Sequence, residues 1–488
     1  MILRFLAPLL ALALLASSLH AENDPPGFII KNEIIPSPSA PGAIAPQLVN
    51  APDGTVYLLW LEPAPSHRIA VRFARFDATK RTWSSVRTIS EGMDKDVPKN
   101  QTPRLAVLAD CTLIALWYPS RDLALTATST NGGLSWSAPC VLNRPLHFVE
   151  DPTLQPLPDG RVLTAWIEPG QANHALLARI LETTAPAVVV DETVSAGSAP
   201  ALATFPDGSA LLAYRGQTAG GVHDIRTARF DDGKWDAPAT LNLDGWKPAS
   251  PPRDGPALTA RGPHIAAAWF TAAGGARINV SVSGNAGFQW LAPGRVDDTA
   301  PLGRIGLVLL DDGSQLVSWV ERVQNEPVIL LRRISPRGTL SVPVMLARTV
   351  YGPPPQLARV KDSTTTPAQL LLTYLQPASG LATLTTRLIT LPDAASLAEI
   401  DPCDCEPSPE DLRGYAVKGG IVAIDAVHST LQLDHGNIPG VLKAATTTLK
   451  ASPEVLRTLQ PGQTLLARIE RIGPDWTIFN VHILASPR

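Results

Sequence analysis

The sequence predicts an all-β protein, in which a β-propeller is followed by a small OB-type β-barrel. The first observation is a short apolar run that ends in an aromatic residue and recurs seven times, at intervals of 48 to 57 residues. The second is an Asp seven positions before five of these aromatic residues, which three times belongs to a Pro-Asp-Gly turn. A strand–turn–strand unit with a period near 50 residues is typical of a β-propeller. The aromatic residues are Trp60, Trp117, Trp166, Tyr214, Trp269, Trp319 and Tyr374.

Each repeat predicts four strands. The first, such as residues 46–49, leads into a Pro-Asp-Gly or Asp-Gly turn, which favours a hairpin. The second is apolar throughout, as in TVYLLW, TLIALW and RVLTAW, and this predicts burial on both faces between packed blades. The third alternates in several repeats, and a weaker fourth strand follows it. A pair of β-sandwiches is the alternative, but sandwiches do not repeat with fixed internal offsets.

The count of strands indicates how the ring closes. There are seven copies of the first three strands but six following fourth strands. The segment 28–34 looks like a fourth strand and would complete the last blade, which removes the free sheet edges of an open array. We therefore expect seven blades closed by the N-terminal strand. Six blades are the alternative, if the copy that ends at Tyr374 is peripheral.

The N-terminus and the charge balance indicate an exported protein. Residues 1–21 resemble a secretory signal peptide, with Arg4, an apolar run over 5–15 and a small-residue cleavage site at 19–21. The run is short for an uncleaved anchor, and no later segment is long enough to span a membrane. We expect a periplasmic or secreted protein of bacterial type. The net charge is −3 and no Lys/Arg cluster stands out, which argues against a nucleic-acid partner.

Two turns between third and fourth strands share the pattern S-x-N-x-G-x-x-W, at residues 129–136 and 283–290. In such a turn the Asn side chain caps its own backbone, Gly adopts a positive φ and Trp covers the corner. The pattern resembles the Asp-box, or BNR repeat, of the sialidase superfamily, with Asn in place of Asp. The resemblance implies a sialidase-like propeller in which these turns lie on the face away from the active site.

The same resemblance implies a site at the axial mouth, where three Arg bind a substrate carboxylate beside a Tyr nucleophile and an Asp acid/base. An Arg fork suits a carboxylate because it donates two parallel hydrogen bonds and stays charged. The structural alternative is that Arg304 pairs with Asp297 or Asp298 rather than with a ligand. The catalytic candidates are Arg104, Arg253, Arg304, Tyr351 and Asp151, with Glu150 and Asp254 as further acids.

Two observations count against a sialidase. The family's early F/Y-R-I-P signature is missing, and the nearest string, over residues 102–105, has its order reversed. In addition, Glu62, Glu168 and Glu321 each follow a repeat aromatic by two residues and are expected at the same mouth. The negative charge of an acidic mouth would repel an anionic sugar rather than concentrate it.

The repeat ends after Pro392, so we assign residues 27–396 to the propeller. Residues 397–412 are acidic and Pro-rich, as is typical of a linker. Residues 413–488 then show four strand-like segments and a short helical turn that ends in Pro-Gly, a pattern that suits a five-stranded OB-type barrel. The strand-like segments are 415–425, 429–435, 464–470 and 476–483.

The C-terminal segment resembles the periplasmic CusF-type copper-binding domain, on the strings G-x-V-x-x-I-D, L-x-x-D-H-x-x-I-P-G and L-x-P-G-Q. The resemblance implies a Cu(I) site of one His and two Met capped by a Trp, because soft thioethers suit a soft ion. The His corresponds to His435, the two Met positions to Thr446 and Thr448, and the Trp position to Lys443. Residues 413–488 contain no Met, so the family's copper site is expected to be lost.

The cysteines leave two alternatives open. Cys403 and Cys405 lie directly before the barrel and could join His435 in a thiolate–imidazole site for Cu(I) or zinc. Alternatively, the two cysteines form a local disulfide or are free thiols in a loop. Cys111 and Cys140 fall at the same end of the second blade. In an exported protein the compartment would permit a disulfide between them.

The sequence supports two functions. The first is an exported binding scaffold, with a glycan or a protein as the ligand at the propeller mouth and a copper-handling or vestigial barrel. The second is a secreted exo-acting glycoside hydrolase of the sialidase type that uses the same mouth. Whether the protein is an enzyme stays open at this point.

Overall fold

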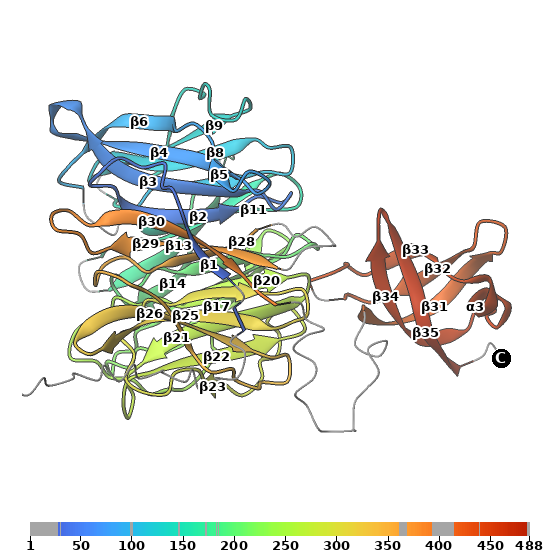
Figure 1. Ribbon diagram of the computed structural model, residues 1–488. Helices are drawn as coiled ribbons and strands as arrows, with labels where there is room; N and C mark the ends of the chain where they lie inside the picture. The colour runs from blue at the N-terminus through green and yellow to red at the C-terminus, as the bar shows by residue number, and fades with distance from the viewer. Residues whose placement is uncertain are drawn as a thin grey trace, which may run out of the picture.

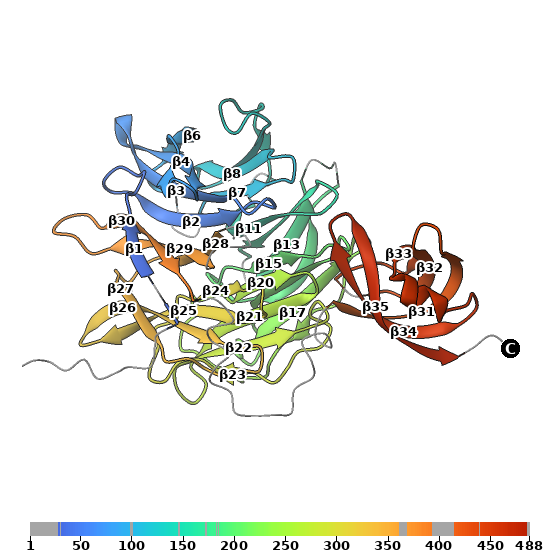
Figure 2. The same cartoon turned by 45° about the vertical axis from the view of Figure 1, so that its right-hand side comes forward.

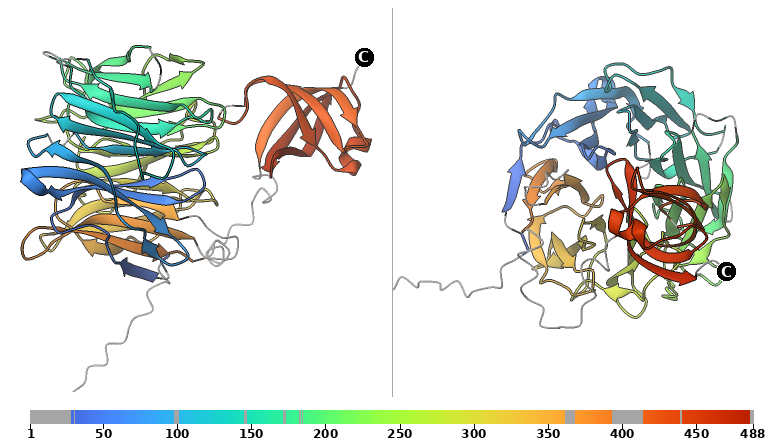
Figure 3. Two further views of the ribbon diagram at one scale, coloured as in Figure 1. Left: turned by 90° about the horizontal axis from the view of Figure 1, so that it is seen from above. Right: turned by 90° about the vertical axis from the view of Figure 1, so that its right-hand side faces the viewer.

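The protein has seven β-sheets arranged around one axis and a separate five-stranded barrel, as the ribbon views show (Figures 1 and 3). The computed structural model describes residues 28–29, 31–97, 101–144, 147–170, 173–181, 183, 185–360, 368–392, 414–438 and 440–485. The expected signal peptide, the linker, and Cys403 and Cys405 lie outside the described residues. Among the described residues, no helix is long and apolar enough to cross a membrane.

Each blade is an antiparallel sheet in which strands follow one another in sequence order. Blade 1 contains β2 (Ile44–Asn50), β3 (Val56–Ala64), β4 (Arg68–Asp77) and β6 (Arg87–Asp94), with η1 (Pro65–His67) and the short β5 (Thr82–Trp83). Blade 2 contains β7 (Arg104–Val107), β8 (Leu113–Ser120), β9 (Leu123–Ser129) and β10 (Cys140–Val141). Blade 3 contains β11 (Glu150–Pro156), β12 (Val162–Glu168), β13 (His174–Ile180) and β14 (Val188–Val194).

The remaining blades follow the same plan. Blade 4 contains β15 (Ala201–Thr204), β16 (Ala210–Arg215), β17 (Ile225–Asp231) and β19 (Ala239–Thr240), with the short β18 (Lys234–Trp235). Blade 5 contains β20 (Ala257–Arg261), β21 (His264–Thr271), β22 (Arg277–Ser283) and β23 (Gly294–Arg295). Blade 6 contains β24 (Gly306–Leu309), β25 (Gln315–Val323), β26 (Glu326–Ile334) and β27 (Val344–Arg348).

The ring closes as the sequence predicts. Blade 7 contains β28 (Gln356–Val360), β29 (Gln369–Gln376), β30 (Thr383–Thr390) and, as its outer strand, β1 (Lys31–Ile35) from the N-terminus. The strand β1 pairs antiparallel with β30, from Lys31 opposite Thr390 to Ile35 opposite Thr386. The ring therefore has seven blades, and the copy that ends at Tyr374 is a full blade rather than a peripheral one.

The apolar second strands form the core between blades. The side chains of Trp60, Trp269 and Trp319, within β3, β21 and β25, are fully buried. Their indole N–H groups reach carboxylates, because a buried donor without a partner is costly. The N–H of Trp60 donates to Glu62, that of Trp319 donates to Glu321, and that of Trp269 donates to Asp244.

The two S-x-N-x-G-x-x-W turns have the same hydrogen bonds. The amide oxygen of Asn131 accepts from the N–H of Ser135 at 3.0 Å, and that of Asn285 accepts from the N–H of Gln289 at 2.9 Å. Gly133 and its equivalent Gly287 both have a positive φ, of 83° and 86°. The side-chain capping and glycine geometry expected of these turns are therefore present in both.

Two faces of the propeller are used below. The upper face carries the segments that lead into the first strand of each blade, and the lower face carries the hairpins between first and second strands and the two S-x-N-x-G-x-x-W turns. Cys111 lies in the lower-face hairpin between β7 and β8. Cys111 and Cys140 are exposed free thiols, so the bridge that the sequence left open is not formed.

The C-terminal barrel closes in the order β31, β32, β33, β35, β34. Its elements are β31 (Tyr415–Asp425), β32 (Thr430–His435), β33 (Ala445–Lys450), α3 (Pro453–Arg457), β34 (Thr464–Ile472) and β35 (Asp475–Ala485). The sequence missed β33, whose run of threonines lacks an apolar alternation. The barrel lies against the lower face of the propeller, beside blades 4 and 5, as Figures 2 and 3 show and the contacts below establish.

Candidate functional site

Three of the predicted residues on the upper face form one group. Arg304, between blades 5 and 6, donates through its backbone N–H and its Nη1 to Oδ1 of Asp254, at 3.0 and 3.2 Å. Its guanidinium carbon lies 5.0 Å from the centre of the Tyr351 ring, between blades 6 and 7. The Tyr351 side chain is 60% exposed. An exposed aromatic ring is thus fixed over a cation that a carboxylate holds in place.

The expected ion-pair partners of Arg304 were wrong. Asp297 accepts from Arg295, and Asp298 accepts from Arg332. Both aspartates lie close to Arg304 in sequence, but the blade geometry turns them toward β23 and β26. Asp254, fifty residues before Arg304, takes that position instead because the chain crosses the upper face between neighbouring blades.

Sequence reasoning missed Arg215, the residue that fixes Asp254. It is 1% exposed and donates to the backbone carbonyls of Asp254, His223 and Phe270. Its guanidinium stacks on the ring of Trp246 at 4.9 Å. Burial lowers the pKa of Arg215 to about 10, so it stays charged at neutral pH. The sequence signal that could have found Arg215 is its position directly after Tyr214, one of the repeat aromatic residues.

A second group joins Arg104 and Asp151 at the interface of blades 2 and 3. Asp151 is 8% exposed, its φ is +48°, and a shift in register interrupts the pairing of β11 and β12 at this point. Burial raises the pKa of Asp151 to about 7, against the opposing effect of the Arg104 charge and with the help of Glu150. Its Oδ2 and the hydroxyl of Tyr118 are buried without a partner among the described residues.

The three candidate arginines do not form one carboxylate clamp among the described residues. Nε of Arg104 donates to the carbonyl of Pro152 at 2.7 Å, and burial lowers its pKa. Arg304 pairs with Asp254, and Arg253 is exposed. Arg304 therefore lies against Tyr351, whereas Arg104 donates to the Pro152 carbonyl beside Asp151, on other blades of the ring.

The glutamates expected to make the mouth acidic are tied to other groups. Glu62 accepts from Trp60 and Arg72, and Glu321 accepts from Trp319 and Thr299. Glu168 lies 2.8 Å from Nδ1 of His147. An arginine balances the charge of Glu62, whereas the hydrogen bonds from Trp319 and Thr299 orient Glu321 and leave its charge in place.

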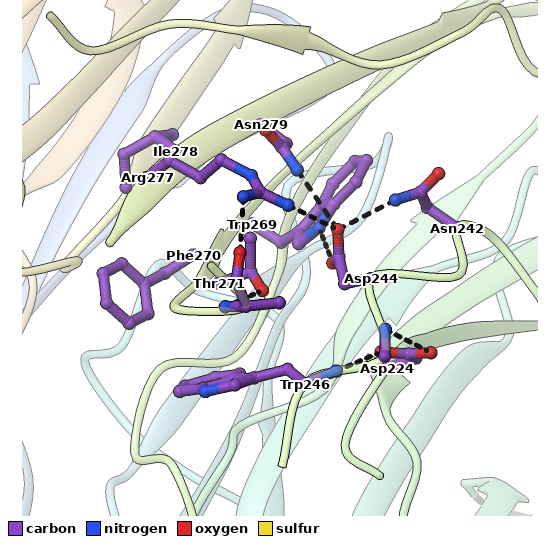
Figure 4. A network of polar contacts seen from close by, with 12 residues as sticks. Asp224, Asn242, Asp244, Trp246, Trp269, Phe270, Thr271, Arg277, Ile278 and Asn279 are labelled. Carbon is purple, nitrogen blue, oxygen red and sulfur yellow. Dashed lines mark hydrogen bonds and ion pairs between the residues drawn. The ribbon is translucent and has the colours of Figure 1, made fainter. Parts of the chain in front are cut away.

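A polar network joins the loop between blades 4 and 5 to β21 and β22 (Figure 4). The side chain of Asp244 is 1% exposed and accepts from Trp269 at 2.7 Å and from Asn242 at 2.9 Å, with Arg277 at 3.7 Å. Asp224 accepts from the backbone N–H groups of Gly245 and Trp246. This network holds Trp246, on which Arg215 stacks, and so orients the loop that carries Asp254.

The barrel residues at the family's copper positions do not form a copper site. His435 is 4% exposed, with its Nδ1 2.8 Å from the carbonyl of Gly436 and its Nε2 2.8 Å from the hydroxyl of Thr447. Since a carbonyl only accepts, Nδ1 carries a proton, and Nε2 is hydrogen-bonded to the Thr447 hydroxyl. Thr446 and Thr448 are exposed and flank Thr447, so they point to the other face of β33.

The chemistry of the side chains at the family's copper positions also argues against a Cu(I) site. Hydroxyl groups are hard, weak ligands for Cu(I), and the Lys443 ammonium would repel the ion. Among the described residues no group of three or more His, Cys, Asp or Glu could hold a metal. His435 thus has neither a free nitrogen nor a soft neighbour within the described residues.

Lys443 and Gly440 instead contact the propeller. Nζ of Lys443 lies 2.5 Å from Oδ1 of Asp232 and 3.4 Å from Oδ1 of Asp231, at the hairpin between β17 and β18. The backbone N–H of Gly440 donates to Oδ2 of Asp207 at 2.8 Å. Lys443, which stands at the Trp position of the CusF resemblance, therefore binds the lower face of blade 4, and Gly440 binds beside it.

Comparison with known families identifies the C-terminal barrel. Residues 414–483 match the family described as copper binding periplasmic protein CusF, so the C-terminal barrel is a CusF-like domain. The chain matched none of the curated proteins with which it was compared.

The solved structures that match have low sequence identity to this chain. An ulvan lyase of polysaccharide lyase family PL25 is 11% identical, with a TM-score of 0.47, over 76% of this chain and 100% of its own. The GH93 α-L-arabinofuranosidase of Fusarium graminearum is 17% identical, with a TM-score of 0.42, over 62% and 96%. An α-L-arabinanase of Penicillium chrysogenum is 14% identical, with a TM-score of 0.43, over 73% and 96%.

Proposed function

We propose that this chain is an exported, non-catalytic binding protein whose propeller binds a glycan at its upper face. The observation that carries the proposal is the exposed ring of Tyr351, fixed over Arg304 while Asp254 holds Arg304. An aromatic face packs on the C–H surface of a sugar ring, and neighbouring charged groups hydrogen-bond its hydroxyls. Because contacts within the protein already hold these side chains in place, they lose little conformational entropy when a ligand binds.

The test compares two exposed aromatic residues on opposite faces. Tyr351 lies over Arg304 on the upper face, and Phe288, 52% exposed, lies 4.2 Å from the Arg229 guanidinium on the lower face. A panel of neutral and acidic oligosaccharides is screened, and the affinity of the best ligand is measured by calorimetry. We expect Tyr351→Ala to weaken binding about tenfold or more, and Phe288→Ala to leave it unchanged. No binding, or equal loss in both variants, contradicts the proposal.

Asp151 favours a second candidate, a glycoside hydrolase. A carboxyl with a pKa of about 7 holds a proton near neutral pH, as a general acid must. Its low exposure and the separate placement of the arginines argue against this role. The test is hydrolysis of fluorogenic glycosides, a sialoside included: turnover that Asp151→Asn abolishes would establish an enzyme.

A copper-handling role rests on Cys403 and Cys405 alone. The described residues of the barrel do not supply soft ligands, so the family's mode of binding is not proposed for this chain. The direct test is a Cu(I) competition titration on the mature protein under reducing conditions, beside the Cys403→Ser/Cys405→Ser variant. Stoichiometric binding that the variant loses would assign copper to the linker.

A further inference from the structure

A second aromatic group lies on the upper face, at blade 5. It consists of Trp246, in the loop between blades 4 and 5, and Phe270, near the end of β21. Both side chains are partly exposed, and their ring centres lie 5.6 Å apart in an edge-to-face contact. Figure 4 shows the two rings on the same side of the polar network, pointing away from Asp244. We call these two residues the Trp246 group.

A continuous row of contacts joins the Trp246 group to Tyr351. The guanidinium of Arg215 stacks on the Trp246 ring at 4.9 Å, and its Nη2 donates to the backbone carbonyl of Asp254 at 3.1 Å. The carboxylate of Asp254 then accepts from Arg304, which lies 5.0 Å from the centre of the Tyr351 ring. The two aromatic groups are therefore held at fixed positions relative to each other.

The carboxylate between the two groups is held closely. Gly303 has a φ of +84°, and a Cβ there would lie 2.7 Å from both Cγ and Oδ2 of Asp254. A side chain at position 303 would therefore displace the carboxylate. The side chains of Arg304 and Asp254 are 14% and 13% exposed, so they keep a small accessible surface while their neighbours fix them.

One acceptor and one donor stay available between the aromatic groups. Oδ1 of Asp254 accepts both hydrogen bonds from Arg304, through the backbone N–H and Nη1. Oδ2 of Asp254 and Nη2 of Arg304 have no hydrogen-bond partner among the described residues, and residues 185–360, which include blades 4 to 6, are described without a gap. A sugar hydroxyl both donates and accepts, so it suits such a pair of atoms.

The two aromatic groups are too far apart for one sugar ring. Phe270 belongs to blade 5, whereas Tyr351 lies between blades 6 and 7. Packed sheets lie about 10 Å apart, and a sugar ring is about as wide as the aromatic ring on which it packs. A ligand that covers both groups must therefore be a chain.

We propose that the ligand of the upper face is an oligosaccharide chain that crosses blades 5 and 6. One sugar packs on Tyr351, another packs on the Trp246 group, and hydroxyls between them bond to Asp254 and Arg304. Both platforms are already in place, so each contributes apolar contact at a small cost in conformational entropy. This inference rests on the glycan proposal and adds that the ligand is an internal run of several sugars rather than a single terminal sugar.

The test is a series of ligand lengths on the full chain. The probes are neutral gluco-oligosaccharides and acidic galacturono-oligosaccharides, from monomers to hexamers, measured by calorimetry and, for weak short ligands, by ligand-observed NMR. We expect affinity to rise about tenfold or more up to the length that reaches both groups, and then to level off. Tyr351→Ala should weaken every length, whereas Trp246→Ala should weaken only the longer oligomers, by about tenfold.

The comparison of lengths separates contact from support. If Trp246 served only to hold Arg215, its removal would weaken short and long oligomers alike. Trp136→Ala is the matched control: Trp136 is also partly exposed, lies edge-to-face on Phe73 and belongs to the lower face, so its loss should change no affinity. Melting temperatures check that each variant folds; if Trp246→Ala does not, the length series of the wild type decides.

Two results would overturn this inference and leave the glycan proposal standing. The first is binding that depends on Tyr351 but has the same affinity at every length. The second is an equal loss at all lengths in Trp246→Ala. Absence of binding by any oligomer would contradict the glycan proposal itself, and this inference with it.

Discussion

Lys443 of the barrel forms an ion pair with Asp232 of the propeller, with 2.5 Å between Nζ and Oδ1. The pair is exposed and weak by itself, and its hydrogen bond raises the pKa of Lys443 and lowers that of Asp232. Beside it, Gly440 packs closely on the propeller. A Cβ at Gly440 would lie 2.7 Å from the Ala286 side chain and 3.1 Å from Cα of Pro263, and its φ is +70°.

We therefore expect Gly440→Ala to separate the barrel from the propeller, and Lys443→Ala to do so only in part. Small-angle scattering would show a larger radius of gyration for the first variant. Gly436→Ala is the control in the same loop, because a Cβ there meets nothing within 4 Å. An unchanged scattering curve for Gly440→Ala would show that the domains are held elsewhere.

Asp151 predicts a dependence of stability on pH. Its pKa in the folded protein is raised to about 7 from 3.8 by burial, so the folded state binds more protons than the unfolded state between these values. Stability then falls as pH rises from about 4 to about 7, by up to about 4 kcal/mol. Asp151→Asn should remove this slope and also suit the positive φ. Urea unfolding at several pH values measures both; an unchanged slope would refute the assignment.

His435 is expected to stabilise the barrel rather than bind metal. His435→Ala leaves a small cavity and unpairs the Thr447 hydroxyl and the Gly436 carbonyl, which should cost about 2–4 kcal/mol. His428, 77% exposed beside Asp425, is the control, and its replacement by Ala should have little effect. Thermal unfolding of the barrel measures this. Any Cu(I) affinity should persist in a folded His435 variant; its loss there would restore the histidine as a ligand.

We expect two of the repeat tryptophans to contribute different amounts to the free energy of unfolding. Trp319 donates to the buried Glu321, whereas the indole N–H of Trp166 is buried without a partner among the described residues. Both substitutions to Phe remove the same volume, but Trp319→Phe also removes a hydrogen bond to a charged group. We expect it to cost about 1–2 kcal/mol more in the free energy of unfolding, measured in urea. Equal costs would mean that the carboxylate contributes nothing.

The sequence predicted the blades because their signals are local. The apolar run ending in Trp60, the turn at Asp53 and the turn at Asn131 each depend on residues a few positions apart, and the hydrogen bonds they predict are short-range ones. The closing strand followed from counting strands, since a sheet edge must find a partner. The strand β33 was missed because its threonines carry no apolar alternation.

The contacts of the candidate site were less predictable, because they join residues that are far apart in the sequence. Arg304 does lie against Tyr351, but its ion-pair partner is Asp254 rather than Asp297 or Asp298. Arg215 was overlooked because its partners are backbone carbonyls, which no sequence pattern marks. Cys403 and Cys405 stay a prediction, since they lie outside the described residues.

The period, the hairpins, the closure of the ring and the barrel could be predicted from the sequence, because each follows from the hydrophobic pattern and turn chemistry of a short segment. Which charges meet depends on how the blades and the barrel pack. Arg304 reaches Asp254 across a blade boundary, and Lys443 reaches Asp232 across 211 residues. The energy of an ion pair depends on distance and burial in three dimensions, and neither is a property of spacing along the chain.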